Sequence, residues 1–216
     1  MKLFRCFGVL FVLLLATGAV AQERGFRAHR YEGSTVGSWL FMLERPWYSL
    51  TRYGAVGVTA DYSHHALIPG VATGRGQLSP VLEHALVGHV GLAGSLFDRF
   101  RISASLPVTF LETGTPEPVS GAGPLTTIGI ADPRAQLMLR LFGQAERDAI
   151  SLHIGADVWI PIGGAATHQG DVGFRVLPRA VLAGAFGAGR WTMDLGFLLR
   201  PYATIGPPAL QMVAAP

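Results

Sequence analysis

The sequence predicts an all-β fold, an antiparallel up-and-down transmembrane β-barrel that follows an N-terminal signal peptide. Three observations predict it: long stretches of alternating apolar and polar residues, connections that are alternately short and long, and a secretory N-terminus. Successive side chains of a strand point to opposite faces, so strict alternation indicates strands with one apolar face. Each stretch has about a dozen residues, more than the roughly five or six of an average globular strand and enough for the about 9–11 of a transmembrane strand.

The clearest predicted hairpin spans Ile128–Pro161. Residue type switches at every step over Asp132–Leu141, and after a short polar turn the alternation resumes over Ser151–Ile160. One face of both arms is wholly apolar, while the other carries charged and polar side chains. The barrel prediction depends on this pattern, in which each strand has one apolar face and one polar face.

The same alternation predicts strands throughout residues 52–203, the barrel region. Beyond the hairpin, strands are expected at Arg52–Tyr62, His84–Phe97, Phe100–Phe110, Gly173–Phe186 and Trp191–Tyr202. Residues 22–51 precede the barrel as a polar periplasmic leader, in which Ser38–Arg45 is a candidate first strand. Residues 204–216 are expected to be a truncated tail.

Short and long connections alternate along the chain. The short ones are Asp98-Arg99, 143–148 and 187–190, and the long ones are 63–82, 111–125 and 163–172. Outer-membrane barrels have this arrangement, with tight periplasmic turns, longer extracellular loops and aromatic girdles at both interfaces. The aromatic residues beside the short turns are Phe97, Phe100, Phe142, Phe186 and Trp191, and those beside the long loops are Tyr62, Phe110, Trp159, Phe174 and Tyr202.

A secreted β-sandwich is the alternative fold, with the apolar face as its dry core, because alternation is common to both architectures. Strand length, loop alternation and the secretory N-terminus favour the barrel. A closed single-chain bacterial barrel has an even number of strands. About seven or eight strands are present, so either Ser38–Arg45 is a genuine eighth strand or the barrel is incomplete and belongs to a longer protein; we expect incompleteness.

Residues 1–21 have the pattern of a secretory signal peptide. Lys2 and Arg5 precede the apolar run Phe7–Leu15, and small residues precede a cleavage point after Ala21. The run is too short for a membrane-spanning helix, which needs roughly 20 residues. Removing the signal peptide lowers the formal net charge from +3 to about +1 and removes Cys6, the one cysteine. Disulfides, cysteine chemistry and a nucleic-acid partner are therefore not expected.

Several short motifs resemble those of a known family. They are Tyr31-Glu32-Gly33-Ser34 with Trp39, Gly57–Tyr62, Val81–His84, Leu96–Phe100, Ser105–Val108, Ile130–Arg134, Val158–Pro161, Leu177–Arg179 and Leu199–Tyr202. Together they resemble the N-terminal barrel of OmpA-family outer-membrane proteins of Gram-negative bacteria, and they are also similar to the barrels of hydrophobic-compound transporters. The resemblance implies an outer-membrane location, with outer-membrane lipid and the barrel-assembly machinery as partners. Peptidoglycan would be a partner only if a C-terminal domain is missing from this sequence.

In a barrel, the polar face would line the lumen. The expected lumen-facing residues are Asp132, Arg134, Arg140, His153, Asp157, Arg175, Arg179, Asp194 and Arg200. Centring the hairpin turn at Ala145-Glu146 places Arg134 opposite Asp157, a pair that would either plug the interior or set an ion preference. No cofactor is expected. A metal site is not expected either, because His64-His65 falls in a long loop without cysteine or helical histidine spacing.

The function expected from these features is a non-enzymatic outer-membrane barrel that gives structural support or passes small solutes. A transporter of hydrophobic compounds is the alternative, and it predicts an apolar pocket lined by Met138, Trp159 and Leu177. A lipid-modifying enzyme is third and predicts an exposed Ser–His contact at the rim. No catalytic residue is assigned, because no spacing of the serines and histidines in the strands pairs a nucleophile with a base.

Overall fold

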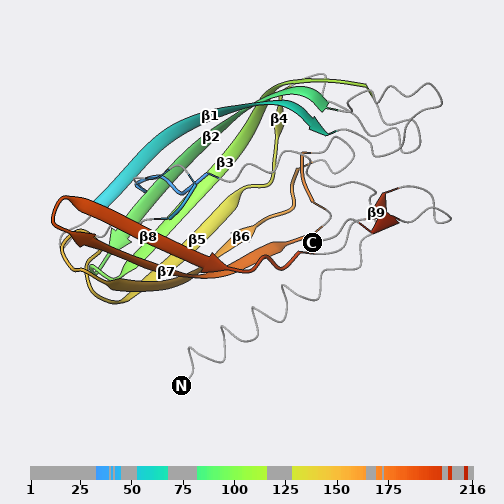
Figure 1. Ribbon diagram of the computed structural model, residues 1–216. Helices are drawn as coiled ribbons and strands as arrows, with labels where there is room; N and C mark the ends of the chain where they lie inside the picture. Colours follow the sequence, from blue (N-terminus) through green and yellow to red (C-terminus); the bar gives the residue numbers. More distant parts are fainter. Residues whose placement is uncertain are drawn as a thin grey trace.

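The computed structural model describes most of the predicted barrel region (Figure 1). The described residues are 33–38, 40, 42–44, 53–67, 82–115, 128–163, 169–171, 173–200, 204–205 and 212–213. The predicted signal peptide, much of the leader and most of the tail lie outside the described residues.

Seven long strands form one antiparallel sheet in which each pairs with the next along the chain. They are β1 (Tyr53–Leu67), β2 (Leu82–Leu96), β3 (Phe100–Thr113), β5 (Arg134–Phe142), β6 (Ser151–Trp159), β7 (Arg175–Phe186) and β8 (Gly189–Gly196). The short β4 (Gly129–Ile130) also pairs with β3, while β9 (Thr204–Ile205) and β10 (Met212–Val213) pair with each other. The sheet curls into a half-barrel (Figure 1), which confirms the all-β antiparallel meander.

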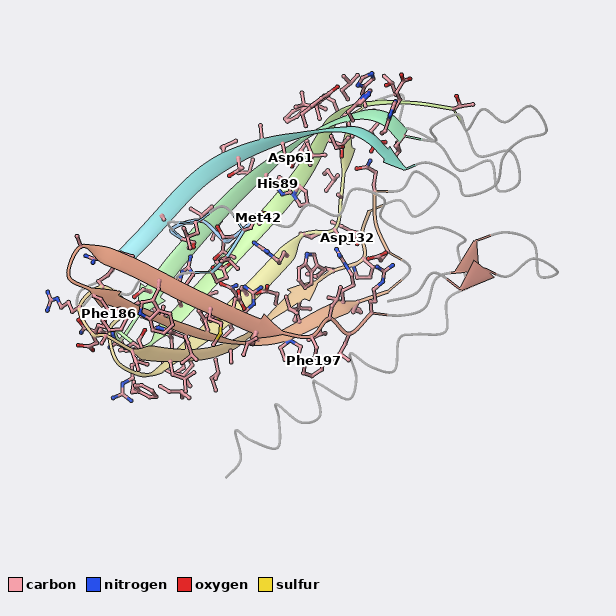
Figure 2. All side chains as sticks on the ribbon, viewed as in Figure 1. Met42, Asp61, His89, Asp132, Phe186 and Phe197 are labelled. Carbon is pink, nitrogen blue, oxygen red and sulfur yellow. The ribbon has the colours of Figure 1, made fainter. Side chains whose placement is uncertain are left out.

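The two faces of the half-barrel have opposite chemistry. Apolar side chains point outward and are exposed, such as Val58 at 73% and Leu137 at 51%. Polar side chains on the inner face are buried, and Arg101 and Asp157 are both 0% exposed. Figure 2 shows the same division, with Asp61 and Asp132 inside the curve. The β-sandwich alternative requires the reverse, a buried apolar face, so the burial of the described residues disfavours it.

The described residues of Ser38–Arg45 form turns and bends, and none of them pairs as a strand. Residues 33–38 and 42–44, which we call the N-terminal segment, lie inside the curve of the sheet (Figure 1). Val36 packs directly against the sheet, because a Cβ added at Gly91 would overlap its side chain. The candidate first strand is therefore an internal segment in this structure.

Two strand ends differ most from the sequence prediction, one longer and one shorter. β1 continues five residues past Tyr62, so His64-His65 belongs to a strand and not to a loop. β8 ends at Gly196 instead of Tyr202. The ladder stops where Pro178 of β7 would pair next, because proline has no N–H to donate to β8. Past this residue, only an isolated bridge between Val176 and Leu199 continues the pairing.

The predicted register of the β5–β6 hairpin is wrong by two residues. Arg134 pairs with Trp159 and Asp157 pairs with Gln136, so Arg134 and Asp157 are not directly opposite. A β-bulge between Arg140 and Phe142 and a turn that extends to residue 150 shift the pairing. Because a shift of two residues preserves side-chain direction, the polar face keeps its predicted members.

The β5–β6 pair also contains a close approach that only glycine permits. A Cβ added at Gly155 would overlap the Leu137 carbonyl oxygen and the Met138 sulfur, whereas a Cβ at Gly54 would meet only one atom, at 4.0 Å. Gly155→Ala is expected to lower the free energy of unfolding by about 1–3 kcal/mol through overpacking. Gly54→Ala is the matched control and should leave it nearly unchanged. Urea unfolding in detergent micelles, followed by tryptophan fluorescence, measures both; equal values would contradict the packing described for β5 and β6.

Candidate functional site: the polar interior

The polar interior, the buried polar side chains of the inner face, contains the residues predicted to line a lumen. Asp132, Arg134, His153, Asp157 and Arg175 are buried in the described structure. Arg140, Arg179, Asp194 and Arg200 are largely covered, each with 10–12% of its side chain exposed. Ion pairs join seven of these nine residues in three separate clusters along the half-barrel, and Arg134 and His153 make hydrogen bonds.

The central cluster is built around Arg179 on β7. Its guanidinium lies 3.5 Å from Glu44 Oε1, 3.5 Å from Asp157 Oδ2 and 3.6 Å from Asp194 Oδ2. Arg101 on β3 approaches the other Glu44 oxygen at 3.4 Å, and its side chain is fully buried. A buried charge needs a partner of opposite sign, so the Glu44 carboxylate offsets two guanidiniums that come from distant strands.

Glu44 also organises the N-terminal segment that carries it. The Thr35 backbone N–H donates to Glu44 Oε1 at 2.7 Å, and the Thr35 hydroxyl donates to Oε2 at 3.0 Å. Thr192 on β8 donates its hydroxyl to the Glu44 carbonyl oxygen at 2.9 Å. The side chain therefore closes the segment into a loop, while its backbone anchors the loop to the wall.

Two arginines on the sheet bind the backbone of the same segment. Arg101 Nη2 donates to the Val36 carbonyl oxygen at 2.6 Å, and Arg134 Nη2 donates to the Gly33 carbonyl oxygen at 2.8 Å. Charge-assisted hydrogen bonds of this kind are stronger than neutral ones. The N-terminal segment is thus bonded to β3, β5 and β8 on the inner face of the sheet.

A second cluster lies where β5, β6 and β7 meet their longer connections. Asp132 accepts the backbone N–H groups of Gly163 and Asp171, each at 2.9 Å. Arg175 Nε lies 2.9 Å from Asp171 Oδ2 and its Nη2 lies 3.8 Å from Asp132, while Arg200 reaches Asp171 at 3.6 Å. These contacts fold the described part of the 160–173 connection over the end of the polar interior.

The third cluster, at the opposite end, is the pair of Arg140 and Asp98, whose Nη2 and Oδ2 atoms lie 2.7 Å apart. Asp98 stands in the tight turn between β2 and β3 and adopts a positive φ of 55°. Aspartate tolerates this left-handed conformation better than most residues. The ion pair therefore connects this turn to β5.

The pocket expected for a transporter to be apolar is small and partly lined by charged side chains in the structure. Trp159 is buried on the inner face, with the guanidinium of Arg175 4.8 Å and that of Arg134 5.9 Å from its ring. Leu177 and Trp159 line a cavity of about 120 Å³ together with charged side chains. Small-molecule sites usually occupy about 300–1,000 Å³ and are predominantly apolar. Trp159 also does not join the outer aromatic girdle, because its side chain points inward.

A serine–histidine contact exists, but not at a rim. Ser151 Oγ lies 3.0 Å from His153 Nε2, and both residues are 0% exposed. The Ser151 hydroxyl also lies 2.7 Å from the Ala183 carbonyl oxygen, to which it donates. A nucleophile must reach its substrate, and this pair is buried on the inner face of the sheet. The exposed contact that an enzyme predicts is absent at Ser151.

Sequence reasoning missed two residues that the central cluster requires. Arg101 stands on the polar face of its strand, so the alternation that selected Arg134 was also a signal for Arg101. Glu44 lies in the leader, outside any alternating stretch, and no local pattern indicated that it faces Arg101 and Arg179. Its role appears only when the segment is seen inside the sheet.

None of the described residues belongs to a helix, so they contain no helical membrane span. Among them, no group of three or more His, Cys, Asp or Glu side chains is placed to hold a metal ion. The chain matches no family, no curated protein and no solved structure with which it was compared. The OmpA-family resemblance therefore stays a prediction.

The contacts of Glu44 predict that removing its charge strongly lowers the free energy of unfolding. Glu44→Gln keeps the shape but removes the charge that faces Arg101 and Arg179, and we expect a loss of about 3–5 kcal/mol in the free energy of unfolding. Glu146→Gln is the control, because Glu146 pairs with the exposed Arg190 at 3.8 Å and should cost less than about 1 kcal/mol. Hydrogen exchange should additionally show faster exchange of the Thr35 amide in Glu44→Gln. Equal stability of the two variants would contradict a central role for Glu44.

Proposed function

We propose that this chain is a non-enzymatic outer-membrane β-barrel protein whose filled interior gives structural support and not solute passage. The single observation that carries the proposal is the inverted burial, with charges inside and large apolar side chains outside. Water would penalise this arrangement, because exposed apolar surface costs about 25 cal/mol per Å². Hydrocarbon around the wall would remove that cost, and the half-barrel would form the larger part of the barrel wall.

The extent of the outer apolar surface supports a lipid environment. Soluble monomers rarely expose a contiguous apolar patch larger than a few hundred Å². The exposed apolar residues here come from every long strand and include Val56, Val58, Leu92, Ile102, Leu137, Ile154 and Leu195. A shallow groove of about 790 Å³ on this outer face is lined mainly by leucine, isoleucine, alanine and phenylalanine, which suits acyl chains.

Exposed aromatic residues at both ends of the strands support the same orientation. Phe97, Phe142 and Phe186 are exposed beside the short turns. Tyr62, Phe110 and Phe174 are exposed beside the long connections. Aromatic belts at the two headgroup levels are typical of outer-membrane barrels. The lengths of the connections place the short turns on the periplasmic side in this proposal, with secretion through the predicted signal peptide and insertion by the barrel-assembly machinery.

The ion-paired interior favours support over transport. A route for hydrophobic compounds needs an apolar path, whereas Trp159 and Leu177 share their cavity with Glu44, Arg134 and Arg175. A pore for small solutes needs open space, whereas the N-terminal segment is bonded to three strands of the wall. Within the proposal, the interior acts as a plug.

A charge placed on the outer face tests the lipid environment. Leu137→Arg, in the middle of β5, should cost about 2–4 kcal/mol and reduce folding into lipid vesicles, whereas Phe97→Arg, in a turn, should cost about 0–1 kcal/mol. In a water-soluble protein both positions are already exposed and arginine would be harmless at either. The measurement is the folded fraction in vesicles after dilution from urea. Leu137→Arg that folds as well as Phe97→Arg, or that stays folded in buffer without detergent, would refute the proposal.

Ion current tests the plug. The refolded chain in a planar bilayer should carry no steady current, because the N-terminal segment and the ion pairs occupy the interior. Glu44→Ala should raise the frequency of current bursts, since it releases the segment from two guanidiniums. A steady conductance of the unaltered chain would show an open pore and contradict the supporting role.

A further inference from the structure

Three side chains with metal-binding atoms gather at the end of the β1–β2 pair, on its outer face. His64 and His84 are directly opposite in the register of the two strands. Tyr62 stands two residues before His64, so its side chain leaves the same face. The sequence separates His84 from His64 by 20 residues, and only the strand pairing brings them together.

The atoms of these side chains converge to distances that suit one ion. His64 Nδ1 and His84 Nδ1 are 3.2 Å apart, and their ring centroids are 4.7 Å apart. Two imidazole nitrogens that bind one tetrahedral zinc ion at about 2.0–2.1 Å lie about 3.3–3.4 Å apart. The two rings therefore already have close to the separation that a shared ion requires.

The surroundings of His84 favour a lone pair on Nδ1. His84 Nε2 lies 3.8 Å from the Glu83 carboxylate, which favours the ring proton on Nε2. Metal-binding histidines commonly donate their other N–H to a carboxylate in a hydrogen bond; here the separation is longer and only the charge of Glu83 acts on the ring. The ring of His65 stacks on that of His64 with centroids 3.7 Å apart, which restrains the second ligand as well.

A cation would also resolve the crowding around His84 Nδ1. Tyr62 Oη lies 2.5 Å from this nitrogen while His64 Nδ1 approaches from 3.2 Å. One lone pair cannot accept two hydrogen bonds well, whereas an ion can bind all three atoms. The phenol would draw back by somewhat under 1 Å, because two ligand atoms of one tetrahedral ion lie about 3.3 Å apart.

We propose that Tyr62, His64 and His84 bind one divalent transition-metal ion, copper(II) or zinc. Imidazole suits both ions, and copper(II) binds most tightly among the divalent metals of its row. The site is accessible, since 37% of the His84 side chain is exposed, and water would complete the coordination. The phenol is the third protein ligand, because no group of three His, Cys, Asp or Glu side chains is placed to hold an ion among the described residues.

Copper(II) titration of the full chain, purified without a histidine tag and refolded in detergent, tests the site. His64→Ala and His84→Ala should each raise the dissociation constant at least about tenfold, which is about 1.4 kcal/mol. His65→Ala is the matched control and should change it by less than about threefold, which is less than 1 kcal/mol. Tyr62→Phe should keep binding but abolish the visible phenolate-to-copper charge-transfer band, a signal that a merely structural role of Tyr62 would not produce.

The outcomes separate the site from background binding and from misfolding. Far-UV circular dichroism and protease resistance must match the unaltered chain before a variant is compared. The proposal is overturned if the His64→Ala/His84→Ala double variant binds copper as tightly as the unaltered chain, or if the unaltered chain does not bind it. It is also overturned if the charge-transfer band survives in Tyr62→Phe. The titration measures metal affinity and not membrane insertion. Its failure would therefore not contradict the proposed function as a supporting outer-membrane protein.

Discussion

The pairing of Glu44 with Arg101 and Arg179 is the interaction on which the interior depends. The two arginines come from β3 and β7, on opposite sides of the curve, and their charges are taken out of water. Removing such charges from water costs several kcal/mol per ion, and that cost is offset only where opposite charges and hydrogen bonds are placed well. Glu44 provides both, because its carboxylate faces the arginines while Thr35 donates to it. The segment that carries Glu44 is thus part of the packing inside the half-barrel.

This electrostatic interior explains why the two faces of the sheet have opposite composition. A water-soluble protein stabilises its fold by burying apolar surface, but here the described apolar side chains lie mostly outside. The folded state must then derive its stability from the hydrogen-bonded ladders, from the buried ion pairs and from whatever covers the outer face. Hydrocarbon forms no hydrogen bonds, so an apolar outer face suits it. The proposed membrane location therefore accounts for both the apolar outer face and the polar interior.

The two ends of the half-barrel are closed by different means. At the short turns, Asp98 and Arg140 connect neighbouring hairpins with a single ion pair. At the other end, Asp132 and Asp171 bind backbone N–H groups and arginines of the connecting segments, so those segments pack over the interior. The histidine pair of β1 and β2 differs from both, because it faces outward and joins no interior cluster.

The sequence alone determined the approximate positions of the long strands and the apolar and polar faces of most of them, because period-two alternation is a local property of the chain. Arg134, Asp157 and Arg179 lie on the inner face of the sheet, and the two-residue error in register does not change the face to which a side chain belongs. The tertiary structure alone decided which charges meet. Glu44 and Arg101 lie 57 residues apart, and His64 meets His84 only through strand pairing. Contacts of this kind depend on register, curvature and the path of a segment with no repeating pattern, and no local spacing of residues encodes them.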